Sequence, residues 1–358
     1  MKVVNAICAV ALIGAVSTPA LAQSSAQSIL NRLRTGNTLP ASPNATGAKT
    51  ASSGPISAPA MPVALKKSMG QQKAFAIFPG RVIVAGYNVG GFRTAKTTGR
   101  ASGGILNNNP GASSTVELVA WGIDLPLLTR IASAAHADLI AQLTAAGFDV
   151  VPQEQVMASE GADKLKLGGD AYDVEVPADR GNMKGIVTGP AATGVRGNYP
   201  LARTEFGSFG APLLSLTQQA MVIMPNLMFD FAGLKSSKSI GYTASASASL
   251  QFGINPALST MRVMASRRKE FLEGDFIFKL DGNAVSDEPI GSIADSSRSD
   301  NSYQQALGNA LGVGVRAQSR ESSAVSIDQA KYEGLALSAA RGWNAAFVSQ
   351  LKAATSKP

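Results

Sequence analysis

The sequence predicts an α+β or mixed α/β fold, in which a mixed, largely antiparallel sheet is packed by an amphipathic helix at about 124–146 and a C-terminal helix at about 328–352. Apolar residues recur every three or four positions in both segments, as is typical of amphipathic helices. Residues 242–252 instead alternate between apolar and polar side chains, which indicates an antiparallel strand with one polar face. A chain of 358 residues is long enough for one large domain.

The first 22 residues have the pattern of a secretory signal peptide. Lys2 supplies a positive charge, residues 3–16 are apolar, and the Ala-Leu-Ala at 20–22 matches the pattern that signal peptidase cuts. The apolar run is shorter than the roughly 20 residues of a membrane-spanning helix. Cys8 lies inside this run, so we do not expect lipid attachment. The sequence therefore predicts a periplasmic or secreted protein with a cleaved signal peptide that is not a lipoprotein.

Cleavage would remove the only cysteine and leave His136 as the only histidine. A chain without thiols has no thiol catalysis, no cysteine-zinc site and no iron–sulfur cluster. His136 lies beside the apolar stripe of the first long helix, so we expect it at the helix surface or at the boundary of the core. We expect no catalytic residues, no cofactor and no metal, and therefore a protein that is not an enzyme.

Residues 23–70 are expected to form a flexible basic arm, because Ser, Pro, Ala and Gly predominate there. No Asp or Glu precedes Glu117, so the net positive charge lies in the first third of the chain. Such charge is attracted to anionic phosphates, although it can equally serve only to solvate a disordered arm. Candidate residues for binding an anionic surface are Arg32, Arg34, Lys66, Lys67, Arg93, Lys96 and Arg100. Export and the lack of interleaved aromatic residues argue against nucleic acid.

A single folded domain is expected at 71–358. Residues 81–89 and 116–121 are predicted strands, and the polar segment 94–114 between them is predicted to be a loop. Asp124 is a candidate N-cap for the helix that Gly147 ends. A short strand at 148–151 and a short helix at 153–159 are expected next.

The segment at about 161–212 is rich in Gly and Pro, with one strand signal at 171–176. An insertion of this length is typical of a functional loop or a disordered segment. Antiparallel strands are then predicted at 218–231, 242–252, 261–266 and 275–280. Ser326 and Gln329 form a capping-box pattern before the C-terminal helix.

Two patterns bear on catalysis. Residues 90–97 match the sequence motif of a phosphate-binding loop at all but one position, where Ala95 replaces a glycine. The motif must lead into a helix, but glycines follow it here, so we expect no nucleotide site. Paired carboxylates act in glycosidases, and the candidates are Glu117, Asp124, Asp170, Asp173, Glu175, Glu205 and Asp230. Asp230 lies within an apolar strand, and we expect it on an edge strand or facing solvent.

The order of strands and helices from 81 to 159 resembles a group of bacterial envelope proteins. An amphipathic helix leads into a strand of the type Gly-Phe-x-Val-Val, here residues 139–151. In this respect the chain is similar to the curli secretion lipoprotein, the lipoprotein activators of penicillin-binding proteins and the amino-terminal domain of the Tol-system translocation protein. The resemblance implies action by binding and assembly, whereas the lipid-bearing cysteine of the lipoproteins is missing here.

We therefore expect an exported, non-enzymatic protein that binds an envelope protein or an anionic envelope surface, for example in assembly or secretion, and that can form a homo-oligomer. One alternative is a subunit of an oligomeric outer-membrane secretion pore, because eleven residues at 242–252 match the length of a tilted membrane-spanning strand. Another alternative is a carboxylate-dependent glycan hydrolase.

Overall fold

The computed structural model of the chain describes residues 58–70, 73–102, 111–158, 171–178, 181–190, 217–240, 244–268, 273–301, 304 and 316–356. The predicted signal peptide at 1–22 and the predicted arm up to residue 57 lie outside the described residues. The same holds for Arg32, Arg34, Asp170 and Glu205.

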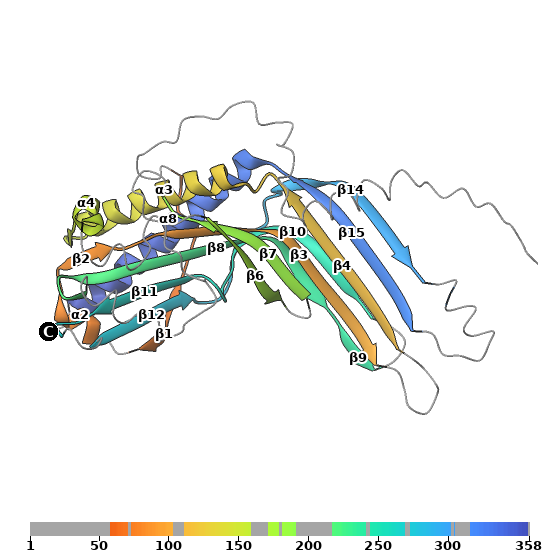
Figure 1. Cartoon of the computed structure of the whole chain (residues 1–358), viewed down its shortest axis with the longest axis horizontal. Coiled ribbons are helices and arrows are strands. Elements are labelled where there is room, and N and C mark those ends of the chain that lie inside the picture. The colour runs from red at the N-terminus through yellow and green to blue at the C-terminus, as the bar shows by residue number, and fades with distance from the viewer. Residues whose placement is uncertain are drawn as a thin grey trace, which may run out of the picture. The chain divides into compact units, whose positions relative to one another are not determined.

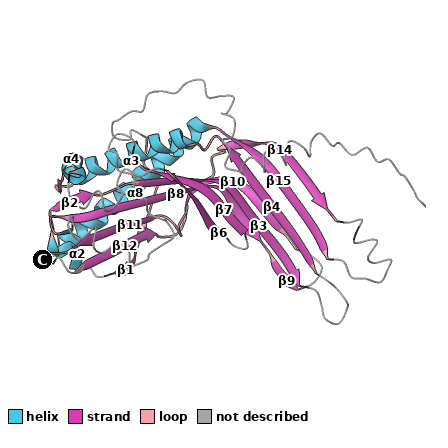
Figure 2. Ribbon diagram, viewed as in Figure 1, coloured by secondary structure: helices cyan, strands magenta, loops and turns pink. Residues whose placement is uncertain are grey.

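The described residues form four helices and one sheet of fifteen strands (Figure 1 and Figure 2). The helices are α2 (Lys73–Ile77), α3 (Leu125–Ala145), α4 (Gln153–Met157) and α8 (Gln329–Thr355). The strands are β1 (Leu65–Gly70), β2 (Arg81–Val84), β3 (Asn88–Ser102), β4 (Ala112–Trp121), β5 (Asp149–Val150), β6 (Tyr172–Ala178), β7 (Gly181–Thr188), β8 (Met221–Ser236), β9 (Lys238–Ile240), β10 (Ala246–Ile254), β11 (Thr260–Ala265), β12 (Gly274–Leu280), β13 (Ala284–Ser286), β14 (Gly291–Asp300) and β15 (Ala317–Ile327).

The sheet is mixed and largely antiparallel, which confirms the predicted fold class. Its main path runs β1-β12-β11-β8-β3-β4-β15-β14. Strand β15 is parallel to β4, although about 200 residues separate them in the chain. Each of these strands leads into a long helix, so α3 and α8 start at the same end of the sheet and pack side by side (Figure 1). An ion pair between Arg130 and Glu333, at 2.9 Å, joins the two helices.

Helix α3 confirms the first helix prediction. Asp124 is its N-cap, and the carboxylate accepts a hydrogen bond from the backbone N–H of Leu127 at 2.9 Å. Gly147 follows the helix with a φ of 93°, a left-handed conformation that favours glycine. The chain then enters β5, whose Asp149 and Val150 pair with β2. The strand, helix and strand predicted for this region are therefore present.

Helix α8 confirms the predicted C-terminal helix, but its start differs from the expected one. The side chain of Asp328 accepts hydrogen bonds from the backbone N–H groups of Ala330 and Lys331. The expected capping box of Ser326 and Gln329 is wrong, because Ser326 still belongs to β15, where it pairs with β4. A capping residue must directly precede the first helical turn.

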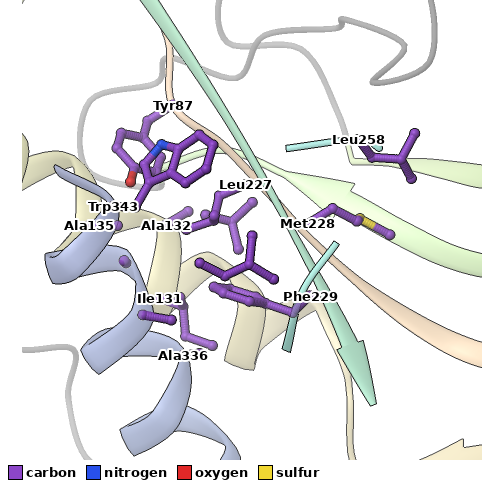
Figure 3. Packing of buried hydrophobic residues seen from close by; sticks show 14 of the residues in the cluster. Tyr87, Ile131, Ala132, Ala135, Leu227, Met228, Phe229, Leu258, Ala336 and Trp343 are labelled. Atoms are coloured by element: carbon purple, nitrogen blue, oxygen red, sulfur yellow. The ribbon is translucent and has the colours of Figure 1, made fainter. Parts of the chain in front are cut away.

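The apolar stripes of the two long helices form the core against the sheet. Figure 3 shows Trp343 of α8 beside Tyr87, with Ile131 of α3 and Phe229 of β8 in the same cluster. All four side chains are fully buried. The core therefore combines residues from four separate parts of the sequence.

A network of buried polar groups lies within this core. Asn344 of α8 donates hydrogen bonds to the backbone oxygen of Ala135, at 3.0 Å, and to the carboxylate of Asp138, at 2.9 Å. Its own amide oxygen accepts from the hydroxyl of Tyr87 at 2.8 Å. Gln142 donates to the same Asp138 carboxylate at 2.6 Å. Asn344 thus connects both helices and the chain segment between β2 and β3.

His136 is buried rather than at the surface or boundary, so that expectation is wrong. Only 2% of the residue is exposed, because the folded chain covers a side of α3 that a lone helix would present to water. Burial lowers the pKa of His136 to about 4. Its ring lies edge-on to Tyr87 with 6.5 Å between the ring centroids. The imidazole is therefore a neutral core group at pH 7.

Three boundaries differ from those expected. The polar segment 94–114 is not one long loop, because β3 extends to Ser102 and β4 begins at Ala112. Within the predicted insertion at 161–212, the described residues include β6 and β7, which pair antiparallel. Strand β1 belongs to the sheet although it lies inside the segment expected to be flexible. In each case strand pairing orders a polar segment: β3 with β4 and β6 with β7 pair as neighbours in sequence, whereas β1 pairs with the distant β12.

Residues 58–63 lie along α8 before β1 begins. The backbone N–H of Met61 donates to the Ser338 oxygen at 3.0 Å, and the Ser338 hydroxyl donates to the Pro59 oxygen at 2.6 Å. Gly342 lies directly beneath, where a Cβ atom would overlap the Met61 carbonyl group. Small residues on this side of α8 therefore let an extended segment approach the helix backbone.

Replacing Gly342 with alanine is expected to lower the free energy of unfolding by about 1 to 3 kcal/mol, because the extended segment must move away. This loss outweighs the gain of about 1 kcal/mol in helix propensity. Gly334 is the matched control, since a Cβ atom added there would meet no neighbouring atom within 4 Å. Gly334→Ala should raise stability in the same urea titration. If both alanine substitutions stabilised the protein equally, the packing of residues 58–63 against α8 would be contradicted.

Candidate functional site: a polar sheet face

Six strands continue the sheet beyond the part that the long helices cover. Their order is β6-β7-β3-β4-β15-β14, and β3, β4, β15 and β14 are seen running past the helices in Figure 1. Register places Lys96 opposite Glu117, Thr98 opposite Thr115, and Arg100 opposite Ser113. Residues directly opposite each other in a ladder share one face.

This face of the six strands is polar throughout, and we call it the polar face. None of its side chains is fully buried. Lys96 and Arg100, two of the predicted anion-binding residues, lie on it, whereas Arg320 was not predicted. The polar face consists of Lys96, Thr98, Arg100, Ser113, Thr115, Glu117, Glu175, Asn182, Lys184, Ser297, Ser299, Gln318, Arg320 and Ser322.

Ion pairs and hydrogen bonds order part of the polar face. Arg320 reaches the carboxylate of Glu117 at 2.7 Å, and Lys184 reaches Glu175 at 3.0 Å. Hydrogen bonds from Lys184 and Asn182 lower the pKa of Glu175. These contacts occupy the carboxylates of Glu117 and Glu175, whereas Asp173, on the same side of β6 as Glu175, is exposed and forms no ion pair with a described residue.

Lys96 and Arg100 lie between these ion pairs. Neither forms an ion pair with any described carboxylate, and Arg100 is exposed. A hydroxyl pair lies beside them, since the Thr98 and Thr115 oxygens are 3.0 Å apart. The centre of the polar face therefore combines two basic side chains that form no ion pair with a described carboxylate, one of them opposite Glu117, with hydroxyl groups.

The opposite face of β3 is covered by β8 and β10. Ala95, Thr97, Gly99 and Ala101 are buried there. A Cβ atom on Gly99 would overlap the backbone of Ser245, so the two layers come into close contact at this position. This covering layer explains why only the other face of the strands is open.

The predicted alternation at 242–252 is confirmed for residues 244–249 and ends at Leu250 and Gln251, which are both partly buried where the pairing of β10 with β8 shifts register. The alanines at 244, 246 and 248 are half-buried towards the other layer, whereas Ser245, Ser247 and Ser249 are exposed. Residues 242 and 243 lie outside the described residues. A pore lined by this strand stays a prediction, and the exposed serine row is compatible with it.

The remaining predicted anion-binding residues lie elsewhere or are engaged. Lys66 of β1 pairs with Asp281 at 3.2 Å, and the Lys67 ammonium lies 5.9 Å from the centre of the Phe276 ring. Arg93 is partly buried, and its Nε donates to the Ile123 backbone oxygen at 3.0 Å. Burial lowers the pKa of Arg93. Only Lys96 and Arg100 of the set therefore share one described surface.

The candidate carboxylates have separate structural partners. Asp124 caps α3, and Gln329 donates to it at 3.1 Å. Glu117 and Glu175 form the ion pairs of the polar face. Asp173 is exposed on β6. These contacts give Asp124, Glu117 and Glu175 structural roles.

Asp230 differs from the expectation of an edge or solvent-facing position. It is partly buried in β8, a strand with neighbours along both sides, and it pairs with Gly253 of β10. Asn255 donates to both of its carboxylate oxygens, at 2.9 and 3.2 Å. Burial raises the pKa of Asp230 to about 7, although the hydrogen bonds from Asn255 oppose the shift.

The described residues contain no group of three or more His, Cys, Asp or Glu placed to hold a metal ion. Residues 90–97 lie within β3, so within this described segment the near match to a phosphate-binding loop has no helix after it. None of the described helices combines the length and apolar character needed to cross a membrane.

Comparison with known proteins finds no matching family model, no matching curated protein and no matching solved structure. The resemblance to the envelope proteins named above stays a prediction. Function is therefore argued from the geometry of the polar face.

Proposed function

We propose that this chain is an exported, non-enzymatic protein that binds an anionic envelope surface or an envelope partner protein through the polar face. The observation that carries the proposal is the position of Lys96 and Arg100, which share one open face and form no ion pair with a described carboxylate. The predicted signal peptide would bring this face to the cell envelope.

The chemistry of the face suits anionic oxygen groups. Lys96 and Arg100 supply charge, and neighbouring Ser and Thr hydroxyls supply hydrogen-bond donors. A sheet holds these groups at fixed spacing, so little ordering is needed on binding. A flat array of this kind fits a repeated ligand such as phosphate headgroups better than a single enclosed molecule.

The double change Lys96→Ala and Arg100→Ala is expected to weaken binding to phosphatidylglycerol vesicles about thirtyfold, since each basic side chain near an anionic surface contributes about 1 kcal/mol. Cosedimentation of the mature protein with vesicles at low salt measures the effect. Raising the salt concentration should weaken wild-type binding as well.

Lys331→Ala with Lys352→Ala is the matched control, because both lysines are exposed on α8 and away from the polar face. This pair should bind vesicles nearly as well as the wild type. Equal losses in the two double variants, or no wild-type binding to anionic vesicles, would contradict the assignment of binding to the polar face.

A further inference from the structure

Strand β14 ends the sheet with a long open edge. It has ten residues and is the longest described strand that pairs with only one neighbour, β15. Ser296, Arg298 and Ser299 are exposed. Ile293 is 59% exposed and is one of two large hydrophobic side chains exposed among the described residues. An exposed strand edge presents backbone groups that can pair with another chain.

The direction of these backbone groups follows from the ladder. The N–H of Asn301 donates to the Gln318 oxygen at 3.1 Å, so at this pair the backbone groups point towards β15. Such pairs alternate along an antiparallel ladder. Ser297 and Ser299 therefore point their backbone groups at β15, whereas Ser296 and Arg298 point theirs to the open edge.

Two other strands that end the sheet carry features that block pairing. Strand β1 has Lys66 and Lys67, which are exposed, and Lys is typical of protected edges. Strand β6 has Pro177, which lacks a backbone donor, between exposed Glu175 and the turn to β7. Strand β14 contains neither Lys nor Pro. Strand β14 does contain charged residues at 295, 298 and 300 and a register shift between Ile293 and Asp295, so it differs from β1 and β6 in lacking Lys and Pro, not in lacking all protection.

We propose that β14 binds an extended segment of a partner polypeptide as an added antiparallel strand. Only a polypeptide backbone repeats donors and acceptors at the spacing of a strand edge. The serines of β14 impose little steric demand, while Arg298 favours an acidic residue opposite it, as Glu321 is opposite it in β15. The inference rests on the proposed function, of which it specifies the partner and the binding mode.

A second copy of this chain fits the edge less well. The other end of the same six strands is β6, where Pro177 removes a donor and Asp173 and Glu175 are exposed carboxylates. Head-to-tail joining of β14 to β6 would therefore lack the backbone hydrogen bond that Pro177 cannot donate and would bring two exposed carboxylates to the junction. A heterologous partner strand has no such restriction.

The test uses the full mature chain and a fluorescent peptide with the sequence of residues 317–327, which places a glutamate opposite Arg298. Ser296→Pro removes one donor at the open edge and no hydrogen bond to β15. We expect peptide binding to weaken by about tenfold or more, measured by fluorescence anisotropy, with an unchanged unfolding midpoint. Ser296→Ala should bind like the wild type, and Ser297→Pro should lower the unfolding midpoint because its donor faces β15.

Peptide binding that is equal in wild type and Ser296→Pro, or absent in the wild type, would overturn the strand-addition proposal. So would a wild-type dimer in sedimentation that Ser296→Pro dissociates, because the edge would then join two copies. Vesicle binding separates this proposal from the proposed function. Ser296→Pro should still bind vesicles. If the double variant Lys96→Ala with Arg100→Ala bound vesicles as well as the wild type while the peptide still bound, only the polar-face assignment would be overturned.

Discussion

Replacing Asn344 with alanine is expected to lower the free energy of unfolding by about 3 to 5 kcal/mol. Asn344 is fully buried and bonds to Tyr87, Ala135 and Asp138. Its loss leaves the carboxylate of Asp138 with the Gln142 amide as a remaining donor and leaves the Tyr87 hydroxyl without its acceptor. Buried polar groups without partners carry the full penalty of their lost hydration.

Urea unfolding followed by tryptophan fluorescence measures this effect, since Trp343 lies in the same core cluster. Tyr87→Phe is the control, because it removes one donor and leaves the contacts of Asn344 with α3 intact. It should cost only about 1 kcal/mol. A loss at Asn344→Ala no larger than that at Tyr87→Phe would show that the network does not hold the two helices together.

The stability of the protein is expected to fall as the pH rises from about 4 to 7, through Asp230. The folded-state pKa of about 7 lies above the ordinary value of 3.8. Between these values the unfolded chain has released the proton that the folded chain retains, so unfolding releases a proton and rising pH favours it. The contribution of Asp230 to the free energy of unfolding is fully present below its ordinary pKa of 3.8. It is lost as the pH rises past the pKa of about 7 that Asp230 has in the folded chain. A shift of this size corresponds to about 4 kcal/mol.

Asp230→Asn should remove this dependence, because an amide does not titrate and can still accept a hydrogen bond from Asn255. The measurement is the difference in unfolding free energy between wild type and variant at pH 4.5, 6.0 and 7.5. Asp287→Asn, at an exposed turn, is the control and should follow the wild type. Parallel pH profiles for the wild type and Asp230→Asn would refute a burial-induced shift at Asp230.

Several elements were predictable because their signals are local. The three- and four-residue spacing of apolar side chains located α3 and α8, and Asp124 with Gly147 marked the ends of α3. The alternation at 242–252 likewise indicated which residues of β10 face water. Each signal operates within one or two turns of helix or one strand.

The candidate site was only partly predictable. Lys96 and Arg100 attract notice as basic residues, but nothing near them in sequence indicates that they share a face with Arg320. The strand at 317–323 was missed because all of its residues after Ala317 are polar, and short Ser-rich runs without apolar alternation are typical of loops. Strand partners about 200 residues apart leave no local trace.

The sequence by itself determined where the two long helices and several apolar strands form and which sides of the helices are apolar, because these depend on short-range periodicity and caps. The tertiary structure decided which groups lose contact with water. The packing of α8 against α3 buries Asn344, and the folded chain buries His136 and part of Asp230. The parallel placement of β15 beside β4 assembles the polar face and leaves β14 at its edge. Burial, charge compensation and edge exposure all depend on neighbours distant in sequence, so only the folded chain could assign them.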